Sequence, residues 1–215
     1  EIEGTKIDRD KLMEDIKNAV TTGRTVANLE EDGCYINPTV YADDLTKDCQ
    51  RMNELTDVVV TYDFSDRKET VDRSVIKNWL TKDENDDLVL DKAVIADYIS
   101  ELAKKYDTVG TERTFSTYDN QEITVSGGNY GWVIDQEKET DALYQDIMDK
   151  KTEVREPVYE QEAQSRNTND IGYSYIEIDL TRQRMVLYQN GSPIVDTGFA
   201  ASSSTPTGVY RLGDK

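Results

Sequence analysis

The strongest candidate nucleophiles in this sequence are its two cysteines, Cys34 and Cys49. A cysteine or serine nucleophile needs a neighbouring base to take its proton, and that base is most often a histidine. The sequence contains no histidine, so neither cysteine has an imidazole to activate it, and histidine-based zinc sites are excluded too. We therefore predict no catalytic residue, no metal site and no cofactor within these 215 residues.

The two cysteines admit two structural interpretations. Cys49 lies at helical spacing from Leu45 and Met52, which predicts a small residue on the buried face of a helix. A disulfide between Cys34 and Cys49 is the alternative, since the space outside the cytoplasm permits one. The spacing alone does not decide between them.

A glycine- and aromatic-rich stretch, "SGGNYGW" at 126–132, is the best candidate for ligand binding. Gly127 and Gly128 would let the backbone approach a ligand closely, and Tyr130 and Trp132 could offer ring faces to a sugar. The alternative is a tight turn whose two aromatic side chains pack in the core.

The acidic stretch 83–91 has the alternating oxygen ligands of a calcium loop in Asp83, Asn85 and Asp87. Leu88 stands where such a loop needs a glycine, and Val94 stands where it needs a bidentate glutamate. We expect a solvent-exposed turn here instead of a metal site.

The charge balance argues against two classes of partner. Lys and Arg number 25 against 44 Asp and Glu, a net charge of −19, which would repel nucleic acid and anionic membrane surfaces. With so many carboxylates, adjacent pairs such as Asp86-Asp87 arise by chance and do not indicate a glycosidase. No apolar run is long enough to span a bilayer, so we expect any export signal or membrane anchor to lie upstream of these residues.

Helical periodicity is clearest in the first half of the chain. Leu12, Ile16, Ala19 and Val20 share one face of a helix that ends at Gly23. Similar patterns predict further helices over Asp43–Asp57, Asp72–Leu80, Asp91–Tyr106 and Asp135–Lys151. Asp72 and Asp91 are the predicted N-caps of the second and third of these.

The period becomes alternating elsewhere. Val58–Phe64 is β-branched and aromatic and predicts a buried strand. Two strands are expected around a turn at Asp119–Asn120, and a hairpin is expected around Asn190-Gly191. The polar residues 156–172 have no apolar period and predict a linker.

One motif occurs twice. "IDRDK" at 7–11 returns as "IDQEK" at 134–138, an offset of 127 residues, and a helix and an extended exit follow each copy. We infer that residues 1–32 are the tail of a module of the same kind as the one that follows.

The sequence from Tyr175 onward, "YIEIDLTRQRMVLYQNGSPIVDTGFAASSSTPTGVYRL", resembles the opening of an L,D-transpeptidase catalytic domain, from the bacterial family that cross-links the cell wall. The residues upstream resemble the peptidoglycan-binding module that precedes this domain in Gram-positive bacteria. The stretches that carry this second likeness are "GCYINP", "TYDFSDRKETVDRSVIKNWL", "ELAKKYDTVG", "SGGNYGWVIDQEKE" and "VREPVY".

The resemblance implies an α+β fold, with a mixed helix and sheet module followed by the first strands of a β-rich catalytic domain. It implies the domains 1–32, 33–160 (module), 161–172 (linker) and 173–215 (catalytic strands). The family's cysteine and histidine would lie downstream of Thr205–Tyr210, so neither Cys34 nor Cys49 takes a catalytic role from it. The strands in 173–215 cannot satisfy their edges alone, so we expect them to pack on the module or to pair with another copy.

The resemblance further implies an extracytoplasmic protein of the cell wall, with peptidoglycan as the partner of the module. A non-catalytic tandem-module protein that binds or spaces the wall is the main alternative. A third is an exported adhesion domain without contact to peptidoglycan.

Overall fold

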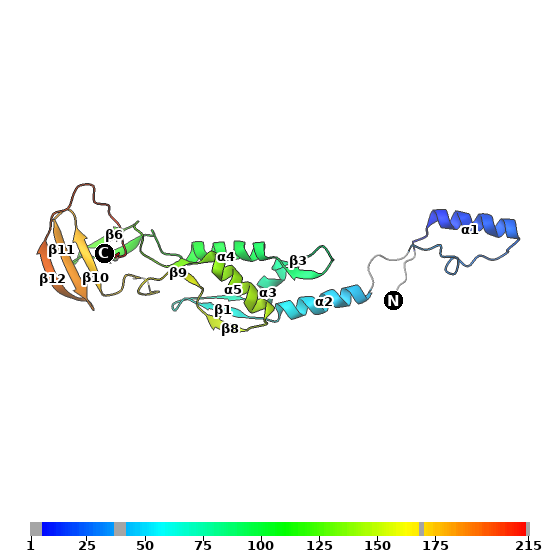
Figure 1. The fold of residues 1–215 in the computed structure, drawn as a ribbon, viewed down its shortest axis with the longest axis horizontal. Coiled ribbons are helices and arrows are strands. Elements are labelled where there is room, and N and C mark those ends of the chain that lie inside the picture. Colours follow the sequence, from blue (N-terminus) through cyan, green and yellow to red (C-terminus); the bar gives the residue numbers. More distant parts are fainter. Residues whose placement is uncertain (1–5, 37–41, 168–169, 214–215) are drawn as a thin grey trace. The chain divides into compact units, whose positions relative to one another are not determined.

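The computed structural model of the protein describes residues 6–36, 42–167 and 170–213 (Figure 1). The chain folds as two compact units, Glu1–Asn53 and Glu54–Lys215. Helices alternate with short strands in small sheets, so the expected α+β class is confirmed. In the described part of the chain, no helix is long and apolar enough to cross a bilayer.

The first unit contains α1 (Arg9–Thr22) and a return segment that runs back along it. Asp8 caps the helix by accepting hydrogen bonds from the backbone N–H groups of Asp10 and Lys11. The helix ends at Gly23, whose φ of 71° is readily adopted only by glycine. An antiparallel bridge between Ile7 and Tyr35 closes this segment.

The interpretation of Cys49 as a core residue was wrong. It lies on α2 (Ala42–Thr56) and is exposed, and its neighbours Leu45 and Met52 are 58% and 43% exposed. Among the described residues of α2, Leu55, near the C-terminal end of the helix, belongs to the apolar core cluster of the second unit. Helical spacing indicates that side chains share a face, but it does not say whether that face is covered.

The second unit is built around a three-stranded sheet in the order β2-β1-β8, with β1 antiparallel to β2 and parallel to β8. The expected buried strand is confirmed, because Val58, Val60, Tyr62 and Phe64 are at most 1% exposed. The three strands are β1 (Val60–Asp63), β2 (Lys68–Val71) and β8 (Glu153–Arg155).

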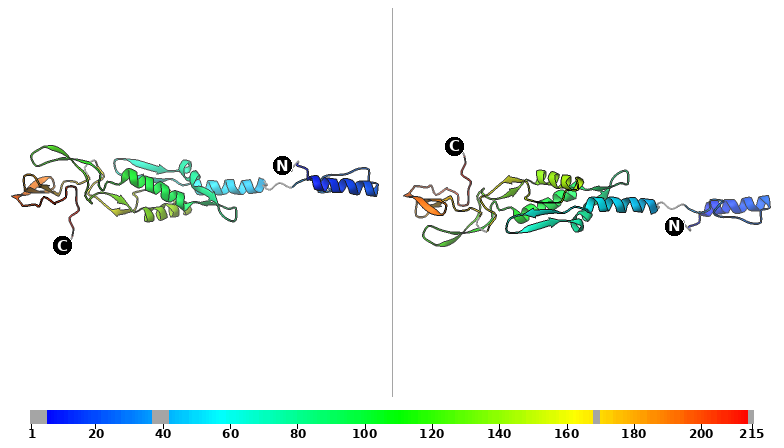
Figure 2. Two further views of the ribbon diagram at one scale, coloured as in Figure 1. Left: turned by 90° about the horizontal axis from the view of Figure 1, so that it is seen from above. Right: turned by 90° about the horizontal axis from the view of Figure 1, so that it is seen from below.

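Two long helices pack side by side in this unit (Figure 2) and contribute much of its core. They are α4 (Lys92–Tyr106) and α5 (Gln136–Met148), which begin after the N-caps Asp91 and Asp135. The expected helix at 72–80 is divided into α3 (Arg73–Ile76), capped by Asp72, and the 3₁₀ helix η1 (Lys77–Trp79). The hairpin of β3 (Leu80–Lys82) and β4 (Leu88–Leu90) follows, and the acidic stretch forms its turn.

A buried ion cluster ties α5 to β1 and β8. Glu139, which is 0% exposed, accepts two hydrogen bonds from the Arg155 guanidinium, one from the Tyr62 hydroxyl and one from the Val158 N–H. Asp146 accepts a further bond from Arg155. Each carboxylate oxygen of Glu139 therefore accepts two hydrogen bonds.

The remaining strands lie toward the C-terminal end of the unit. A hairpin is formed by β5 (Arg113–Ser116) and β6 (Glu122–Val125), and β7 (Val133–Ile134) pairs with β9 (Tyr159–Gln161). The last sheet has the order β10-β11-β12. Its strands are β10 (Tyr175–Asp179), β11 (Arg184–Gln189) and β12 (Ser192–Gly198), and Asn190-Gly191 forms the expected turn with both φ angles positive.

Candidate functional site

The glycine-rich stretch at 127–132 holds the chain's own C-terminal segment. Gly128 and Val209 form a parallel β-bridge, the Gly127 carbonyl accepts from the Val209 N–H at 3.1 Å, and the Tyr130 N–H donates to the Val209 carbonyl at 3.1 Å. The Asn129 side chain accepts from the N–H of Arg211 at 3.0 Å. The backbone that was predicted to approach a ligand thus approaches another part of the same chain.

Glycine is required at Gly128 for two reasons. Its φ is +90°, and a Cβ placed there would lie 1.9 Å from the carbonyl oxygen of Val209. Gly208 faces it with a φ of +140° and an ideal Cβ position 2.8 Å from the backbone of Gly127. The two backbones can approach this closely only because both positions lack side chains.

The two aromatic residues of the stretch are also engaged within the chain. The Tyr130 hydroxyl donates to the Asp170 carbonyl at 2.9 Å and accepts from the Gln164 N–H at 2.8 Å. Trp132 is 7% exposed, and its indole N–H donates to the Ser165 carbonyl at 2.7 Å. The sugar-binding role of Gly127, Gly128, Tyr130 and Trp132 stays a prediction, and the structure shows a packing role for each of them.

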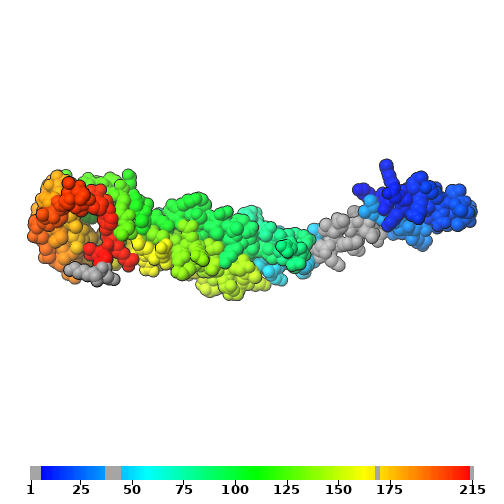
Figure 3. Space-filling model, turned by 45° about the horizontal axis from the view of Figure 1, so that its top comes forward, coloured from blue at the N-terminus to red at the C-terminus, as the bar shows by residue number. Residues whose placement is uncertain are grey.

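The C-terminal sheet packs on the β5–β6 hairpin. The Phe115 ring meets Tyr175 edge-on at 5.4 Å, and the Tyr118 N–H donates to the Glu177 carboxylate at 3.1 Å. Arg184 lies over the Tyr118 ring at 4.3 Å. Figure 3 shows the same end of the unit in space-filling form, with the C-terminal residues against those of the hairpin region. Of the two arrangements expected for 173–215, packing on the module or pairing with another copy, the described residues show packing on the module.

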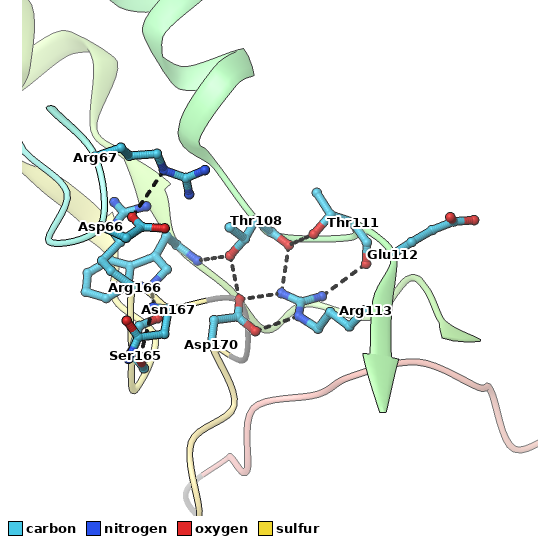
Figure 4. Close-up of a pocket in the computed structure, with 11 residues that line it drawn as sticks. Asp66, Arg67, Thr108, Thr111, Glu112, Arg113, Ser165, Arg166, Asn167 and Asp170 are labelled. Carbon is cyan, nitrogen blue, oxygen red and sulfur yellow. Dashed lines mark hydrogen bonds and ion pairs between the residues drawn. The ribbon is translucent and has the colours of Figure 1, made fainter. Parts of the chain in front are cut away.

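A pocket of about 200 Å³ opens on the module side of this junction (Figure 4). It lies between the turn after β1, the loop between α4 and β5, and the segment that follows β9. Its lining is mainly polar and contains three arginines. The lining residues are Asp66, Arg67, Thr108, Thr111, Glu112, Arg113, Trp132, Ser165, Arg166, Asn167 and Asp170.

One wall of the pocket is a closed ion pair. Arg113 and Asp170 are both buried and bond through two contacts, at 2.7 Å and 2.8 Å. The guanidinium also donates to the carbonyls of Thr108, Thr111 and Tyr130. Arg113 therefore has its hydrogen bonds satisfied within the protein and serves to hold the segment at 170 against the module.

The other wall contains a buried arginine without an ionic partner. Arg166 is 7% exposed and donates one hydrogen bond, from Nη1 to the Tyr106 carbonyl. Its Nε and Nη2 atoms have no hydrogen-bond partner among the described residues. The guanidinium instead lies 4.1 Å from the ring centre of Trp132 and 4.7 Å from that of Tyr159, an arrangement in which ring faces stabilise the cation.

Two further arginines contribute positive charge to the pocket. The Arg166 guanidinium is held between aromatic rings with its Nε and Nη2 atoms buried. Burial raises the pKa of the nearby Asp107 carboxyl, and the charge of Arg166 opposes that rise. Arg67 stands at the half-exposed edge beside Asp66. In the described ranges there is no group of three or more side chains suited to a metal ion.

Sequence analysis missed this pocket. The residues that build it from the predicted linker, Arg166 and Asp170, lie in a polar stretch without periodicity and look like any of the chain's other charged residues. Arg166 and Asp170 of this stretch are nevertheless only 7% and 4% exposed, so the chain is anchored at these two positions.

Neither cysteine lines this pocket, and both are free thiols in the structure. Cys34 is buried, and burial, together with the carboxylates of Asp15 and Asp32, raises the pKa of its thiol. A raised pKa disfavours the thiolate that a nucleophile would need. The disulfide between Cys34 and Cys49 is not formed in this structure and stays a prediction.

The family model described as "putative peptidoglycan binding domain" matches residues 38–155, which is more than half of the chain. The chain belongs to this family.

Two solved structures are similar to the chain, the Ldtfm–avibactam carbamoyl enzyme and a cysteine-to-serine mutant of the Enterococcus faecium L,D-transpeptidase. Each is 28% identical with a TM-score of 0.54, and the matches cover 72% and 71% of this chain. The chain spans 60% of the length of either structure. No curated protein matches it. The resemblance to an L,D-transpeptidase with a peptidoglycan-binding module is confirmed.

Proposed function

We propose that this chain is the wall-binding and positioning part of an L,D-transpeptidase that cross-links peptidoglycan. The module would bind peptidoglycan, and the strands from Tyr175 onward would begin the catalytic domain. Family membership and the likeness to the Enterococcus faecium enzyme support this proposal. The catalytic cysteine and histidine would lie in a part of the protein outside these 215 residues.

The observation that carries the proposal is the bridge between Gly128 and Val209. A module that only tethered an enzyme to the wall would need no backbone contact with the catalytic fold. Here the module's glycine stretch bonds directly to the segment after Thr207-Gly208, and the β5–β6 hairpin packs on the first catalytic strand. Substrate bound by the module would thus be held at a set position relative to the catalytic domain.

The pocket at Arg166 is the proposed contact for peptidoglycan. The peptide stems of peptidoglycan carry carboxylates, and the half-exposed guanidinium of Arg67, together with the buried charge of Arg166, is suited to attract one. We place the protein outside the cytoplasm, at the wall of a Gram-positive bacterium, with any membrane anchor upstream of this chain.

Co-sedimentation of the chain with purified peptidoglycan tests this function. We expect binding that a soluble stem peptide with free carboxyl groups competes away and that its fully amidated form does not. Arg67→Glu, which reverses the charge at the half-exposed edge of the pocket, should weaken binding about tenfold. The matched control is Arg73→Glu, because Arg73 is an exposed arginine outside the pocket.

The possible outcomes separate the alternatives. Failure to sediment with peptidoglycan would overturn the binding function, whereas binding that Arg67→Glu leaves unchanged would overturn only the pocket. The mass of the protein extracted from its cell envelope tests the catalytic part. A native chain that ends near Lys215 would favour the alternative of a non-catalytic wall-binding protein.

A further inference from the structure

The first unit repeats the final helix of the module in position and capping. α1 begins at Arg9 and α5 begins at Gln136, the same 127-residue offset that separates Ile7 from Ile134. Each helix follows an aspartate whose side chain accepts from backbone N–H groups of its first turn. The repeated sequence motif therefore precedes the same kind of capped helix in both places.

The backbone pairing around the two helices repeats as well. The residue before each N-cap forms an antiparallel pair with a tyrosine, Ile7 with Tyr35 and Ile134 with Tyr159. The N-cap residue then donates its own N–H to the carbonyl just before that tyrosine, from Asp8 to Cys34 at 2.8 Å and from Asp135 to Val158 at 2.9 Å. The same arrangement of a capped helix with a backbone pair joining its two flanking segments thus occurs twice.

The two helices differ in what covers them. α5 buries five residues against the module core, whereas α1 buries none. The residues of α1 at those five positions are all apolar, and Met13, Ile16 and Val20 are 53%, 44% and 78% exposed. The buried residues of α5 are Glu139, Thr140, Leu143, Asp146 and Ile147, and their counterparts are Leu12, Met13, Ile16, Ala19 and Val20.

The polar members of the buried face change together. Glu139 and Asp146 both bond to Arg155, and their counterparts are Leu12 and Ala19. The hydrogen bonds to Cys34 and Val158 place the two exit segments 124 residues apart, so the position equivalent to Arg155 holds Glu31 and the ion cluster is not reproduced. An apolar version of the same core would require the loss of both buried carboxylates and of their arginine.

We propose that residues 6–36 are the closing element of a second module of this kind, and that the apolar face of α1 packs against the body of that module. The occupant is a segment of the same chain, N-terminal to α1, equivalent to Val60–Tyr106 of the present module. This inference does not depend on what the module binds. It gives the protein two modules in tandem and two copies of the surface that any module ligand would use.

A chimera tests the equivalence directly. In the 215-residue chain, Asp135–Tyr159 is replaced by the residues of Asp8–Tyr35, so that the α1 face meets the core that α5 normally covers. Tyr62→Phe is included in a second version, since the Tyr62 hydroxyl would lose its partner Glu139. We expect at least the second version to unfold in one cooperative thermal transition.

A charge on the transplanted face supplies the decisive comparison. Ile16→Asp in the chimera should lower the melting temperature by more than about 5 °C, while Ile16→Asp in the parent chain should leave it unchanged. Asn18→Asp is the matched control, because its counterpart Gln145 is exposed, and it should have no effect in either chain. Failure of both chimeras to fold, or equal effects of the two substitutions, would overturn the proposal.

Light scattering of the parent chain tests whether a second copy of the chain, instead of an upstream module, covers α1. A concentration-dependent dimer that Ile16→Asp converts to monomer would show that a second copy of the chain covers α1, and would overturn the tandem module. A monomer at all concentrations supports it.

Discussion

Gly128 of the module and Val209 of the C-terminal segment are joined in a parallel β-bridge, with backbone hydrogen bonds on either side of it. The contact joins the peptidoglycan-binding family's module to the strands that resemble a catalytic domain. It explains why glycines occur at 128 and 208, where the backbones meet.

A methyl group at position 128 should therefore release the C-terminal segment. In Gly128→Ala the new Cβ would collide with the Val209 carbonyl, in addition to a strain of about 1–3 kcal/mol from its positive φ. Hydrogen exchange at the amides of Val209 and Arg211 should accelerate. Gly127→Ala is the control, since its φ is also positive but no atom lies within 4 Å of its ideal Cβ. Equal exchange in the two variants would show that the close approach has no role.

Removing Arg155 should destabilise the module strongly. Arg155→Met leaves the carboxylate of Glu139 buried without its cation, which costs about 3–5 kcal/mol. The double variant with Glu139→Gln should recover much of that loss, because the unpaired charge is gone, the amide oxygen can accept from the Val158 N–H and the amide NH₂ can donate to the Tyr62 hydroxyl oxygen. Urea unfolding measures both. A double variant no more stable than the single one would contradict the role given to the unpaired charge.

Docking of the C-terminal sheet should weaken as the pH rises. Burial raises the pKa of Glu177; the Tyr118 N–H and Arg184 lower it, and Asp119 and Asp179 raise it. A raised pKa means that the folded state holds the proton more tightly, so this stabilisation is complete below the ordinary carboxyl pKa and is lost above the raised one. Glu177→Gln keeps an acceptor for the Tyr118 N–H and has no charge. Its stability relative to the wild type should grow from about pH 4 to about pH 7, as thermal unfolding at several pH values would show; a constant difference would contradict it.

The two cysteines should react at very different rates. Cys49 is exposed, whereas Cys34 is 0% exposed and the pKa of its thiol is raised. Under native conditions iodoacetamide should modify Cys49 at least about a hundredfold faster. Peptide mapping over time measures this, and urea should make the rates equal. Resistance of both thiols until a reductant is added would establish the predicted disulfide instead.

Local features of this protein could be predicted from its sequence. Asp72 and Asp91 could be predicted as helix caps, because a cap bonds to backbone N–H groups within three residues. The Asn190-Gly191 turn and the buried strand at Val58–Phe64 follow from equally local preferences. The motif at 134–138 and its earlier copy could also be recognised, since repetition needs no knowledge of the fold.

What the tertiary structure decided is which of these elements are covered, and by what. Arg166 and Asp170 are buried because they meet Tyr106 and Arg113, which lie 57 to 60 residues away in sequence. Cys49 is exposed although it shares a helix face with apolar residues, and Glu177 is buried although it is charged. Periodicity assigns a side chain to a face, but the free energy of burying it depends on distant partners, and those are brought together only when the chain folds.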